Sequence, residues 1–324
     1  MIRVGIVGYG NLGKGVNIAL TKAVDMQCVG IFTRRAPEAL KPIIDTPVYS
    51  INDLKDFKGK IDVLLLCGGS ATDLPTLTAE ILKDFNTVDS FDTHAKIPEY
   101  FEKLDKVAKE NGNLCAISIG WDPGIFSIAR QLFSAILPCG NDYTFWGKGV
   151  SQGHSDAIRR IKGVKNAIQY TVPKEDALSR VRAGENPSLT TREKHSRECF
   201  VALEDGADKK EIERQIVTMP NYFADYDTVV NFVSEQEVLE MQRKLSHGGF
   251  VIRTGNTSNE NADVLELSLK LDSNPEFTAS VLVAYARAVA KLKKEGKTGC
   301  VTVFDVPLKY LSPLPEEQLR KDLL

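Results

Sequence analysis

The stretch that decides the fold lies at the start of the chain and reads Ile2-Arg3-Val4-Gly5-Ile6-Val7-Gly8-Tyr9-Gly10-Asn11-Leu12-Gly13. A β-prone run is followed at once by the pattern G-x-G-x-x-G, and helical periodicity then continues to about residue 23. In a turn from a strand to a helix, the first glycine permits the tight bend, the second lets backbone approach a pyrophosphate, and the third allows close helix packing. The helix N-terminus adds free N–H groups for anionic oxygen. The pattern indicates dinucleotide binding, and a glycine-rich turn without function is the alternative.

The residues that follow alternate between short β-rich runs and segments of helical periodicity. Strands are expected at 28–32, 61–66, 87–89 and 114–119, and helices at 77–85 and around 101–108. Strands that alternate with helices predict a parallel sheet covered on both faces. The fold class is therefore α/β, with an N-terminal Rossmann domain built on a doubly wound parallel sheet.

The pattern changes after the turn Trp121-Asp122-Pro123-Gly124. An apolar helix is expected at 125–137, followed by longer strands at 198–203, 227–233 and 264–271 and a helix around 209–217, which indicates a second, α+β domain. A chain of 324 residues also exceeds the roughly 250–300 residues that one core usually serves. We expect a dinucleotide-binding domain over residues 1–120 and a substrate-binding and dimerisation domain over 121–274. The helix expected at 278–294 should pack back onto the first domain, so that about 275–324 completes it.

Composition excludes several classes of protein. The 41 basic and 43 acidic residues give a net charge of -2 and no basic run, which argues against nucleic acid and anionic membrane as partners and favours a small molecule. No apolar run approaches the roughly 20 residues of a membrane span, and no secretory signal precedes the first strand, so we expect a cytoplasmic protein. The six cysteines lie far apart without metal-ligand spacing, and we interpret them as reduced core thiols with no metal site.

A second signal concerns the kind of dinucleotide. About twenty residues after Gly13, where an NAD-binding protein places Asp or Glu for the ribose hydroxyls, this chain has Thr33-Arg34-Arg35. A carboxylate there would repel a 2'-phosphate, whereas guanidinium groups bind it bidentately. NADP(H) is the favoured cofactor, and a solvated basic loop is the alternative interpretation.

Stretches spread along the chain carry a family resemblance. In chain order they are Phe32-Thr33-Arg34-Arg35-Ala36, Cys67-Gly68-Gly69-Ser70-Ala71-Thr72-Asp73, Gly120-Trp121-Asp122-Pro123-Gly124, Phe145-Trp146-Gly147, Ser151-Gln152-Gly153-His154-Ser155-Asp156, His247-Gly248-Gly249 and Asn274-Pro275-Glu276-Phe277-Thr278-Ala279-Ser280. Together they resemble the meso-diaminopimelate dehydrogenase family, with closely matching spacing from about residue 2 to residue 313. One departure is Gly69 beside Gly68, where a bulkier neighbour is expected, and we expect a looser loop that keeps its backbone contacts to the cofactor.

The resemblance implies a reaction, a partner and a set of residues. The reaction is reversible NADP-dependent oxidative deamination of meso-2,6-diaminopimelate at its D-centre to L-2-amino-6-oxopimelate and ammonia, a step in lysine and diaminopimelate biosynthesis, and the implied assembly is a homodimer. The implied substrate contacts are Asp92, Asp122, Trp146, Gln152, Gly153, Thr171, Arg197, His247 and Asn274. The implied cofactor contacts are Gly8, Tyr9, Gly10, Asn11, Leu12, Gly13, Thr33, Arg34, Arg35, Cys67, Gly68, Gly69, Ser70, Asp92, Thr93, His94, Gly120, Trp121, Asp122, Pro123 and Gly124.

The chemistry of such a substrate agrees with these residue types. Two ammonium and two carboxylate groups need both signs of charge in the site, which the two aspartates, Arg197 and backbone N–H groups beside glycine supply. Hydride cannot leave carbon while the adjacent nitrogen is protonated, because the nitrogen lone pair must form the imine, so a base has to receive that proton. Asp92 and Asp122 are the candidate catalytic residues, and either carboxylate or a bound water is the base.

Each of these residues also has a purely structural interpretation. Asp122 before a proline is typical of a turn, Trp146 is typical of core filling, and Arg197 is typical of a surface ion pair. His154 and His247 stand beside glycines in polar stretches, where a single histidine is usually structural. The resemblance alone favours a binding role for His247.

Other functions compete with this interpretation. Dihydrodipicolinate reductase would show a paired-histidine motif with a following lysine, and the sugar-oxidising dehydrogenases would show Glu-Lys-Pro where this chain has Ser90-Phe91-Asp92-Thr93-His94. A non-catalytic NADPH-binding sensor would keep the glycine loop and the arginines but lose the polar residues of the second domain. A further alternative is another NADPH-dependent oxidoreductase that acts on an amino acid.

Overall fold

The computed structural model describes residues 1–70, 72–259 and 261–324. The chain forms two compact units, one made of Met1–Ile128 with Pro275–Leu324 and the other of Ala129–Asn274. The boundary thus lies within an apolar helix, α4 (Ile125–Ile136), a few residues beyond the turn at 121–124.

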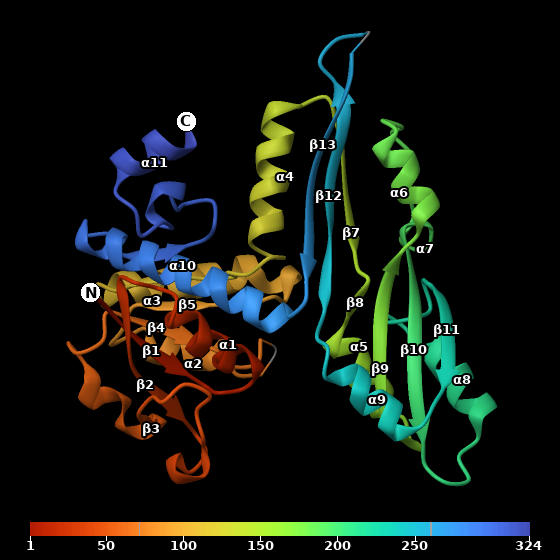
Figure 1. The fold of residues 1–324 in the computed structure, drawn as a ribbon, viewed down its shortest axis with the longest axis horizontal. Helices are drawn as coiled ribbons and strands as arrows, with labels where there is room; N and C mark the ends of the chain where they lie inside the picture. Colours follow the sequence, from red (N-terminus) through yellow and green to blue (C-terminus); the bar gives the residue numbers. More distant parts are fainter. Residues whose placement is uncertain (71, 260) are drawn as a thin grey trace. The chain divides into compact units, whose positions relative to one another are not determined.

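The first unit contains a seven-stranded parallel sheet in the order β14-β6-β5-β4-β1-β2-β3 (Figure 1). Its strands are β1 (Ile2–Val7), β2 (Met26–Thr33), β3 (Val48–Ser50), β4 (Val63–Leu66), β5 (Thr87–Asp89), β6 (Leu114–Ala116) and β14 (Gly299–Val301). The chain order reverses beside β1, which is the point where doubly wound sheets bind ligands. The prediction of an α/β Rossmann sheet is confirmed.

Helices cover both faces of this sheet. They are α1 (Asn11–Leu20), α2 (Leu74–Ile81), α3 (Ile97–Glu110) and α10 (Asn274–Lys294). The unit also contains α11 (Glu316–Leu323), which has no buried residue, and the short 3-10 helices η1 (Pro37–Ala39), η2 (Ile51–Phe57), η3 (His94–Lys96) and η4 (Leu308–Tyr310). Successive residues of β4 enter opposite cores: Val63 and Leu65 pack with α1 and α10, whereas Leu64 and Leu66 pack with α2 and α3. Burial on both faces explains why this strand is continuously apolar.

The C-terminal segment is anchored to the first unit by a charged contact. Arg287 of α10 is 5% exposed and donates to both carboxylate oxygens of Asp25 at 2.7 Å, and its remaining guanidinium nitrogen donates to the Leu311 carbonyl. The hydrogen bonds from Arg287 lower the pKa of Asp25. Breaking such a largely buried pair by removing one partner costs about 3 kcal/mol or more, so the pair holds the last fifty residues against the sheet.

Most elements begin or end a few residues from their predicted bounds, and two of these differences have a local physical cause. The strand expected to reach residue 119 ends at Ala116, because Ser118 takes a left-handed conformation with φ of 58°, which costs a non-glycine residue about 1–2 kcal/mol and cannot continue a strand. The helix expected at 77–85 covers Leu74–Ile81 instead, since Pro75 supplies the preset backbone angle of a first helical turn.

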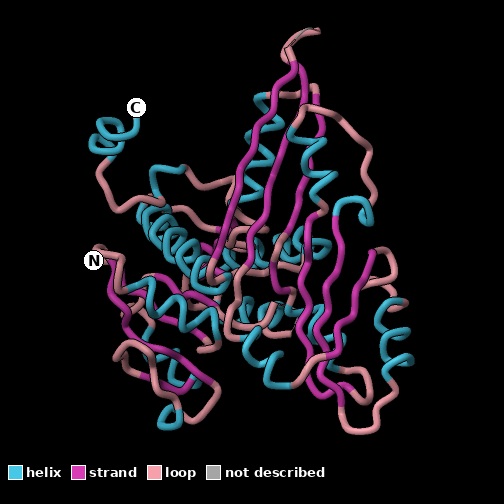
Figure 2. The backbone as a smooth tube through the Cα atoms, turned by 45° about the vertical axis from the view of Figure 1, so that its right-hand side comes forward, coloured by secondary structure: helices cyan, strands magenta, loops and turns pink. Residues whose placement is uncertain are grey.

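The second unit is built on two smaller sheets, visible as long strands in Figure 2. A three-stranded antiparallel sheet has the order β13-β12-β7, and a four-stranded mixed sheet has the order β11-β10-β9-β8. The strands are β7 (Gly140–Trp146), β8 (Gly149–Val150), β9 (Val164–Pro173), β10 (His195–Leu203), β11 (Asp227–Phe232), β12 (His247–Asn256) and β13 (Ala262–Leu271). The helices are α5 (Gln152–Arg159), α6 (Glu175–Arg182), α7 (Thr191–Lys194), α8 (Lys209–Val217) and α9 (Glu235–Gln242). The expected α+β character is confirmed.

The cysteines differ from the expectation of core thiols at one position. Cys115, Cys199 and Cys300 are buried and Cys28 and Cys67 are half-buried, but Cys139 is exposed, so the prediction was wrong for Cys139. It follows the apolar end of α4 at the start of β7, where sequence alone does not distinguish an inward from an outward position. Within the part of the chain that the structure describes, no helix is long and apolar enough to cross a membrane.

Candidate functional site

The predicted cofactor residues of the first unit lie at one edge of its sheet. Strands β1, β2, β4, β5 and β6 are parallel neighbours, so the segments that follow them emerge on the same side. In chain order of the strands, these segments are Gly8–Gly13, Thr33–Arg35, Cys67–Ser70, Asp92–His94 and Gly120–Gly124. Backbone hydrogen bonds hold the first three together: the Gly8 N–H donates to the Phe32 carbonyl at 2.9 Å and the Cys67 N–H to the Val7 carbonyl at 2.8 Å.

The three glycines of the first turn meet different constraints. Gly8 has a positive φ of 89°, which disfavours any side chain. A Cβ on Gly13 would lie 2.2 Å from the Gly8 carbonyl oxygen, so the helix packs against the turn only without one. Gly10 caps α1 with an ordinary φ of -85°, and a Cβ there would meet no atom within 4 Å. The fold therefore requires Gly8 and Gly13. At Gly10, the absence of a side chain leaves open space at the N-terminus of α1.

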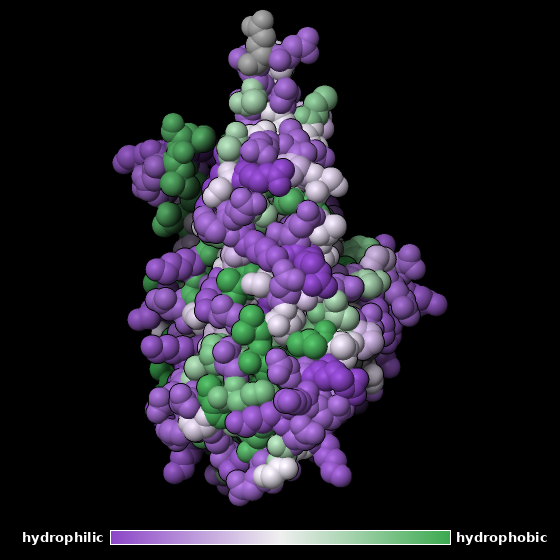
Figure 3. All heavy atoms as spheres, turned by 90° about the vertical axis from the view of Figure 1, so that its right-hand side faces the viewer, coloured by the Kyte–Doolittle hydropathy of each residue, from purple (hydrophilic) through white to green (hydrophobic). Residues whose placement is uncertain are grey.

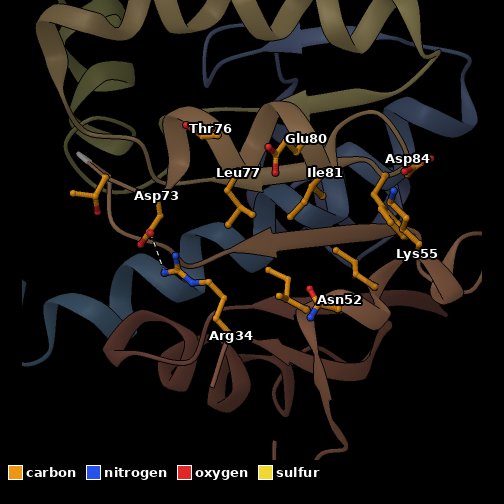
Figure 4. A pocket seen from close by; sticks show the side chains of 13 residues that line it. Arg34, Asn52, Lys55, Asp73, Thr76, Leu77, Glu80, Ile81 and Asp84 are labelled. Carbon is orange, nitrogen blue, oxygen red and sulfur yellow. Dashed lines mark hydrogen bonds and ion pairs between the residues drawn. The ribbon is translucent and has the colours of Figure 1, made fainter. Parts of the chain in front are cut away.

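The two arginines extend from the end of β2 and are exposed. The Arg34 guanidinium donates to Asp73 Oδ1 at 2.9 Å, the contact drawn as a dashed line in Figure 4. The Arg35 guanidinium donates to the Tyr9 carbonyl at 2.9 Å, which brings it to the glycine loop, and its backbone N–H donates to Thr33 Oγ1 at 3.1 Å. Both guanidinium groups are thus directed along the ligand edge and keep further N–H groups for an anion.

A pocket of about 620 Å³ adjoins Arg34 between η2 and α2. Figure 4 shows Asn52 and Arg34 on one side of it, with Thr76, Leu77 and Ile81 of α2 on the other. Its size and its mixed apolar and polar lining are those of small-molecule sites.

In the loop after β4, the described residues Gly69, Asp73 and Leu74 are joined by hydrogen bonds. The Gly69 N–H donates to Asp73 Oδ2 at 2.9 Å, and the Gly69 carbonyl accepts from the backbone N–H groups of Asp73 and Leu74. The hydrogen bond from Gly69, aided by Arg34, lowers the pKa of Asp73. Asp73 therefore connects this loop to Arg34, and Ala71, which belongs to the motif in this loop, lies outside the described residues.

The two candidate catalytic aspartates follow neighbouring strands. Asp92 is exposed after β5, and its N–H donates to the Ser70 hydroxyl at 2.8 Å. Asp122 is half-buried in the turn before α4, where Trp121 and Gly124 form a bridge and the Asp122–Pro123 peptide is cis. The chain continues after Asp92 through Thr93 into η3, which starts at the exposed His94. The turn interpretation of Asp122 is correct, and the turn follows β6 at the same edge of the sheet as the other predicted cofactor segments.

Three predicted substrate residues of the second unit share one face of a sheet. Arg197 pairs directly with Thr171 across β10 and β9, and Thr171 pairs with Gly149 of β8. Directly paired residues point to the same face. A Cβ on Gly149 would lie 2.3 Å from the His247 ring, so that ring occupies the side-chain position of Gly149. Thr171, Arg197 and His247 therefore form a row, with the Arg197 guanidinium in hydrogen-bond contact with the Thr171 hydroxyl.

Arg197 is a buried cation without a carboxylate partner among the described residues. Its side chain is 5% exposed, its guanidinium lies 3.8 Å from the centre of the Tyr226 ring, and its Nε has no hydrogen-bond partner. Burial lowers the pKa of Arg197 from its ordinary value. The interpretation as a surface ion pair is wrong, and a buried, uncompensated guanidinium is suited to bind an anionic group.

The remaining predicted residues of this unit lie close to the row. Gln152 and Gly153 lie in the first turn of α5, and N–H groups at the N-terminus of a helix stabilise a nearby anion. That helix is fixed to β9 by Ser155, whose hydroxyl accepts the Gln169 N–H at 3.0 Å. Asn274 is joined to the segment before His247 by a backbone hydrogen bond to the Leu245 carbonyl at 2.8 Å.

Trp146 depends on a histidine that sequence reasoning missed. His195 Nε2 accepts the Trp146 N–H at 2.8 Å, and the two rings stack with centroids 5.4 Å apart. Burial, with Arg197 nearby, lowers the pKa of His195 to about 3, so its ring is neutral and its Nε2 remains an acceptor. Burial likewise lowers the pKa of His154 to about 4. No sequence pattern marked His195, because its partner lies 49 residues away.

Comparison with known proteins identifies the family. Residues 120–273 match the family model described as Diaminopimelic acid dehydrogenase C-terminal domain. The chain is 57% identical over 323 residues to Meso-diaminopimelate D-dehydrogenase of Lysinibacillus sphaericus, covering 100% of this chain and 99% of that protein. It is 59% identical over 326 residues to the protein of the same name from Acetivibrio thermocellus, covering 100% and 98%. The chain belongs to the meso-diaminopimelate D-dehydrogenase family.

Solved structures agree with this family assignment. The C. glutamicum DAP dehydrogenase in complex with DAP matches with a TM-score of 0.92 and 44% identity, over 100% of this chain and 99% of that chain. An engineered D-amino acid dehydrogenase bound to NADP+ matches with a TM-score of 0.88 and 43% identity, over the same shares. The resemblance inferred from sequence is confirmed, as is the prediction that the chain is an oxidoreductase of this family.

The glycine turn yields a test that separates folding from binding. Gly10→Ala places its Cβ in open space, so we expect an unchanged melting temperature but a loss of NADP+ affinity of at least about tenfold, because the methyl group blocks backbone approach to a pyrophosphate. Gly13→Ala is the matched comparison, since its Cβ clashes with backbone and should lower both the melting temperature and the affinity. Calorimetric unfolding and fluorescence titration measure the two quantities. Unchanged affinity in Gly10→Ala would remove this turn from the binding site.

Proposed function

We propose that this chain catalyses the reversible NADP-dependent oxidative deamination of meso-2,6-diaminopimelate at its D-centre, giving L-2-amino-6-oxopimelate and ammonia. The observation that carries the proposal is the row of Arg197, Thr171 and His247, in which the buried guanidinium has no carboxylate partner among the described residues. Similarity to a DAP dehydrogenase solved with DAP supports the choice of substrate. The first unit would bind the dinucleotide, and the second would bind the substrate and form the dimer.

The residues of the first unit fit an NADP molecule. The open space at Gly10 and the start of α1 suit a pyrophosphate, and Arg34 and Arg35 suit a 2'-phosphate that a carboxylate would repel. The pocket beside Arg34 has room for the adenosine part. The other predicted contacts, at Cys67–Ser70, Asp92–His94 and Gly120–Gly124, belong to the same edge. The chemistry that a dinucleotide held here would supply is acceptance of the hydride from the D-configured carbon.

The residues of the chain bind the substrate and move its proton. Arg197 and Thr171 hold a carboxylate, with His247 beside them, and the N-terminus of α5 offers N–H groups to a second anionic oxygen. An aspartate, either Asp92 or Asp122, holds the reacting ammonium and receives the proton that it loses, directly or through water. Loss of hydride then leaves an imine, which water converts to the oxo group and ammonia. Because the far end of the substrate is fixed, only one configuration is aligned for the reaction.

A non-catalytic sensor would have no use for a buried, unneutralised arginine beside a threonine in the second unit. Burying a cation is costly unless it is paired, so its retention favours a protein that binds an anionic ligand there. We place the enzyme in the cytoplasm, because six unpaired cysteines suit a reducing compartment.

The first prediction for this function concerns the cofactor. The parent protein should prefer NADP+ over NAD+ by at least about tenfold in kcat/KM, because a charge-assisted contact to the 2'-phosphate contributes about 1.5 kcal/mol or more. Arg34→Ala with Arg35→Ala should erase the preference. Arg320→Ala with Lys321→Ala, which removes two exposed cations of α11, is the charge-matched control and should retain it. Equal efficiency of the parent with both cofactors contradicts the assignment.

The second prediction concerns stereochemistry and the base. NADPH formation, followed by its absorbance, should occur with meso-diaminopimelate and not with the LL isomer. Asp122→Asn should lower kcat/KM by about 10² or more, since general-base contributions lie between about 10² and 10⁴, whereas the dissociation constant of NADP+ should change much less. A kcat/KM within a few-fold of the parent would assign Asp122 to the turn and leave Asp92 or a bound water as the base.

The third prediction concerns assembly. Apolar side chains that stay exposed in a single chain, including Leu132 and Ile136 of α4 and Val229 of the edge strand β11, support a homodimer. Apolar groups also gather among hydrophilic ones on the face drawn in Figure 3. Light scattering at micromolar concentration should give twice the chain mass of 35.8 kDa. The mass of a single chain would contradict the dimer.

A further inference from the structure

A buried aspartate outside the predicted site connects the loops that carry both candidate catalytic carboxylates. Asp89 is the last residue of β5 and is 0% exposed. Its Oδ1 accepts the Phe91 N–H at 3.0 Å and the Ser118 N–H at 3.3 Å. Its backbone carbonyl accepts the Ile119 N–H at 2.9 Å. One residue therefore holds the segment that precedes Asp92 and the segment that leads into the turn of Asp122.

The other carboxylate oxygen is held from the opposite side. The Tyr100 hydroxyl lies 2.7 Å from Asp89 Oδ2 and 2.7 Å from the Thr78 hydroxyl, which is itself 3.4 Å from Oδ2. Tyr100 and Thr78 each have a hydroxyl within hydrogen-bond distance of this carboxylate oxygen and of each other. The Tyr100 ring also stacks on Phe91 with centroids 4.1 Å apart. Helices α2 and α3 thus fix the orientation of the carboxylate, and the carboxylate fixes the two loops.

Burying this carboxylate without a cation lowers the stability of the fold, so its presence suggests a role other than stability. No cation pairs with Asp89 among residues 1–70, 72–259 and 261–324, and burial raises the pKa of its carboxyl group above the ordinary range while the hydrogen bonds from Tyr100 and the two amides oppose that rise. Replacing a buried charged group by an apolar one of similar size often leaves the folded protein equally or more stable. One of its donors, Ser118, has the left-handed φ of 58°, a conformation that persists only when its surroundings enforce it.

We propose that Asp89 is a positioning residue that sets the Asp92 and Asp122 loops relative to each other, so that both carboxylates address the same reacting ammonium group. The proposal rests on the function proposed above. Asp89 does not touch substrate or cofactor and acts through the two backbone N–H groups that it accepts. Strands β5 and β6 place the two loops side by side, and Asp89 removes the freedom that remains in their first residues.

The test uses Asp89→Asn in the full-length protein. Asparagine keeps the shape and one acceptor oxygen, but neutral hydrogen bonds are roughly half as strong as charge-assisted ones. We expect kcat with meso-diaminopimelate to fall on the order of tenfold. The dissociation constant of NADP+, measured by fluorescence titration, should change clearly less than kcat, because the two loops also border the cofactor but the glycine turn and Arg34, which would bind its phosphates, do not contact Asp89. Asp62→Asn is the matched control: Asp62 also accepts a backbone N–H, that of Arg3, in the same unit but at the amino ends of β1 and β4, and kcat should stay within about twofold.

A double variant decides whether Asp89 acts through the candidate base. If it positions Asp122, the kcat loss in Asp89→Asn with Asp122→Asn should be clearly smaller than the product of the two single losses, whereas a general structural effect would multiply with the loss at the base. Three results would overturn the proposal. They are a kcat of Asp89→Asn within twofold of the parent, a kcat loss in the double variant equal to the product of the two single losses, and a loss of NADP+ affinity in Asp89→Asn as large as its loss of kcat. A parent protein that forms no NADPH with meso-diaminopimelate would instead contradict the proposed function, and an active parent with an unaffected Asp89→Asn would contradict only the role of Asp89.

Discussion

The parallel pairing of β1 with β2 and β4, continued by β5 and β6, is the constraint on which the rest of the first unit depends. Parallel strands deliver every following loop to the same edge, so residues from position 8 to position 124 converge there, and contacts such as that of Arg34 with Asp73 then join the loops. At the first turn, α1 packs closely because Gly13 has no Cβ that would meet the Gly8 carbonyl.

The two units gather their charges by different means. In the first, backbone N–H groups and exposed arginines lie at the sheet edge, where we propose that the dinucleotide phosphates bind. In the second, an antiparallel register places Arg197 beside Thr171 and a bare Gly149 admits the His247 ring. Flexible phosphate groups tolerate contacts from mobile side chains, whereas discrimination between two ends of a small amino acid requires a rigid, buried arrangement.

Sequence reasoning succeeded where the signal is local or periodic. The turn at 8–13 combines a strand, a glycine pattern and a helix within one short segment, and continuously apolar β4 reports burial on both faces. It failed where a residue depends on a distant partner: the end of β6 is decided by the left-handed Ser118, whose N–H is accepted by Asp89, and His195 is defined by its bond to Trp146. Neither dependence leaves a periodic trace. Arg197 is an intermediate case, because the family resemblance selected it but only its burial excludes a surface ion pair.

Two buried charged residues, Asp89 and Arg197, differ in how completely the chain supplies their hydrogen-bond partners. Asp89 receives hydrogen bonds from two backbone amides and a tyrosine hydroxyl, so its demand for partners is met within the chain and its rigidity passes to the loops it holds. Arg197 contacts a hydroxyl and the face of an aromatic ring, yet its Nε has no partner and no described carboxylate neutralises it. A charge whose partners are all internal stabilises one geometry. A buried charge without a counter-ion is stabilised when an anion binds beside it. Because the cost of removing that charge from water was met during folding, it does not reduce the affinity for a carboxylate.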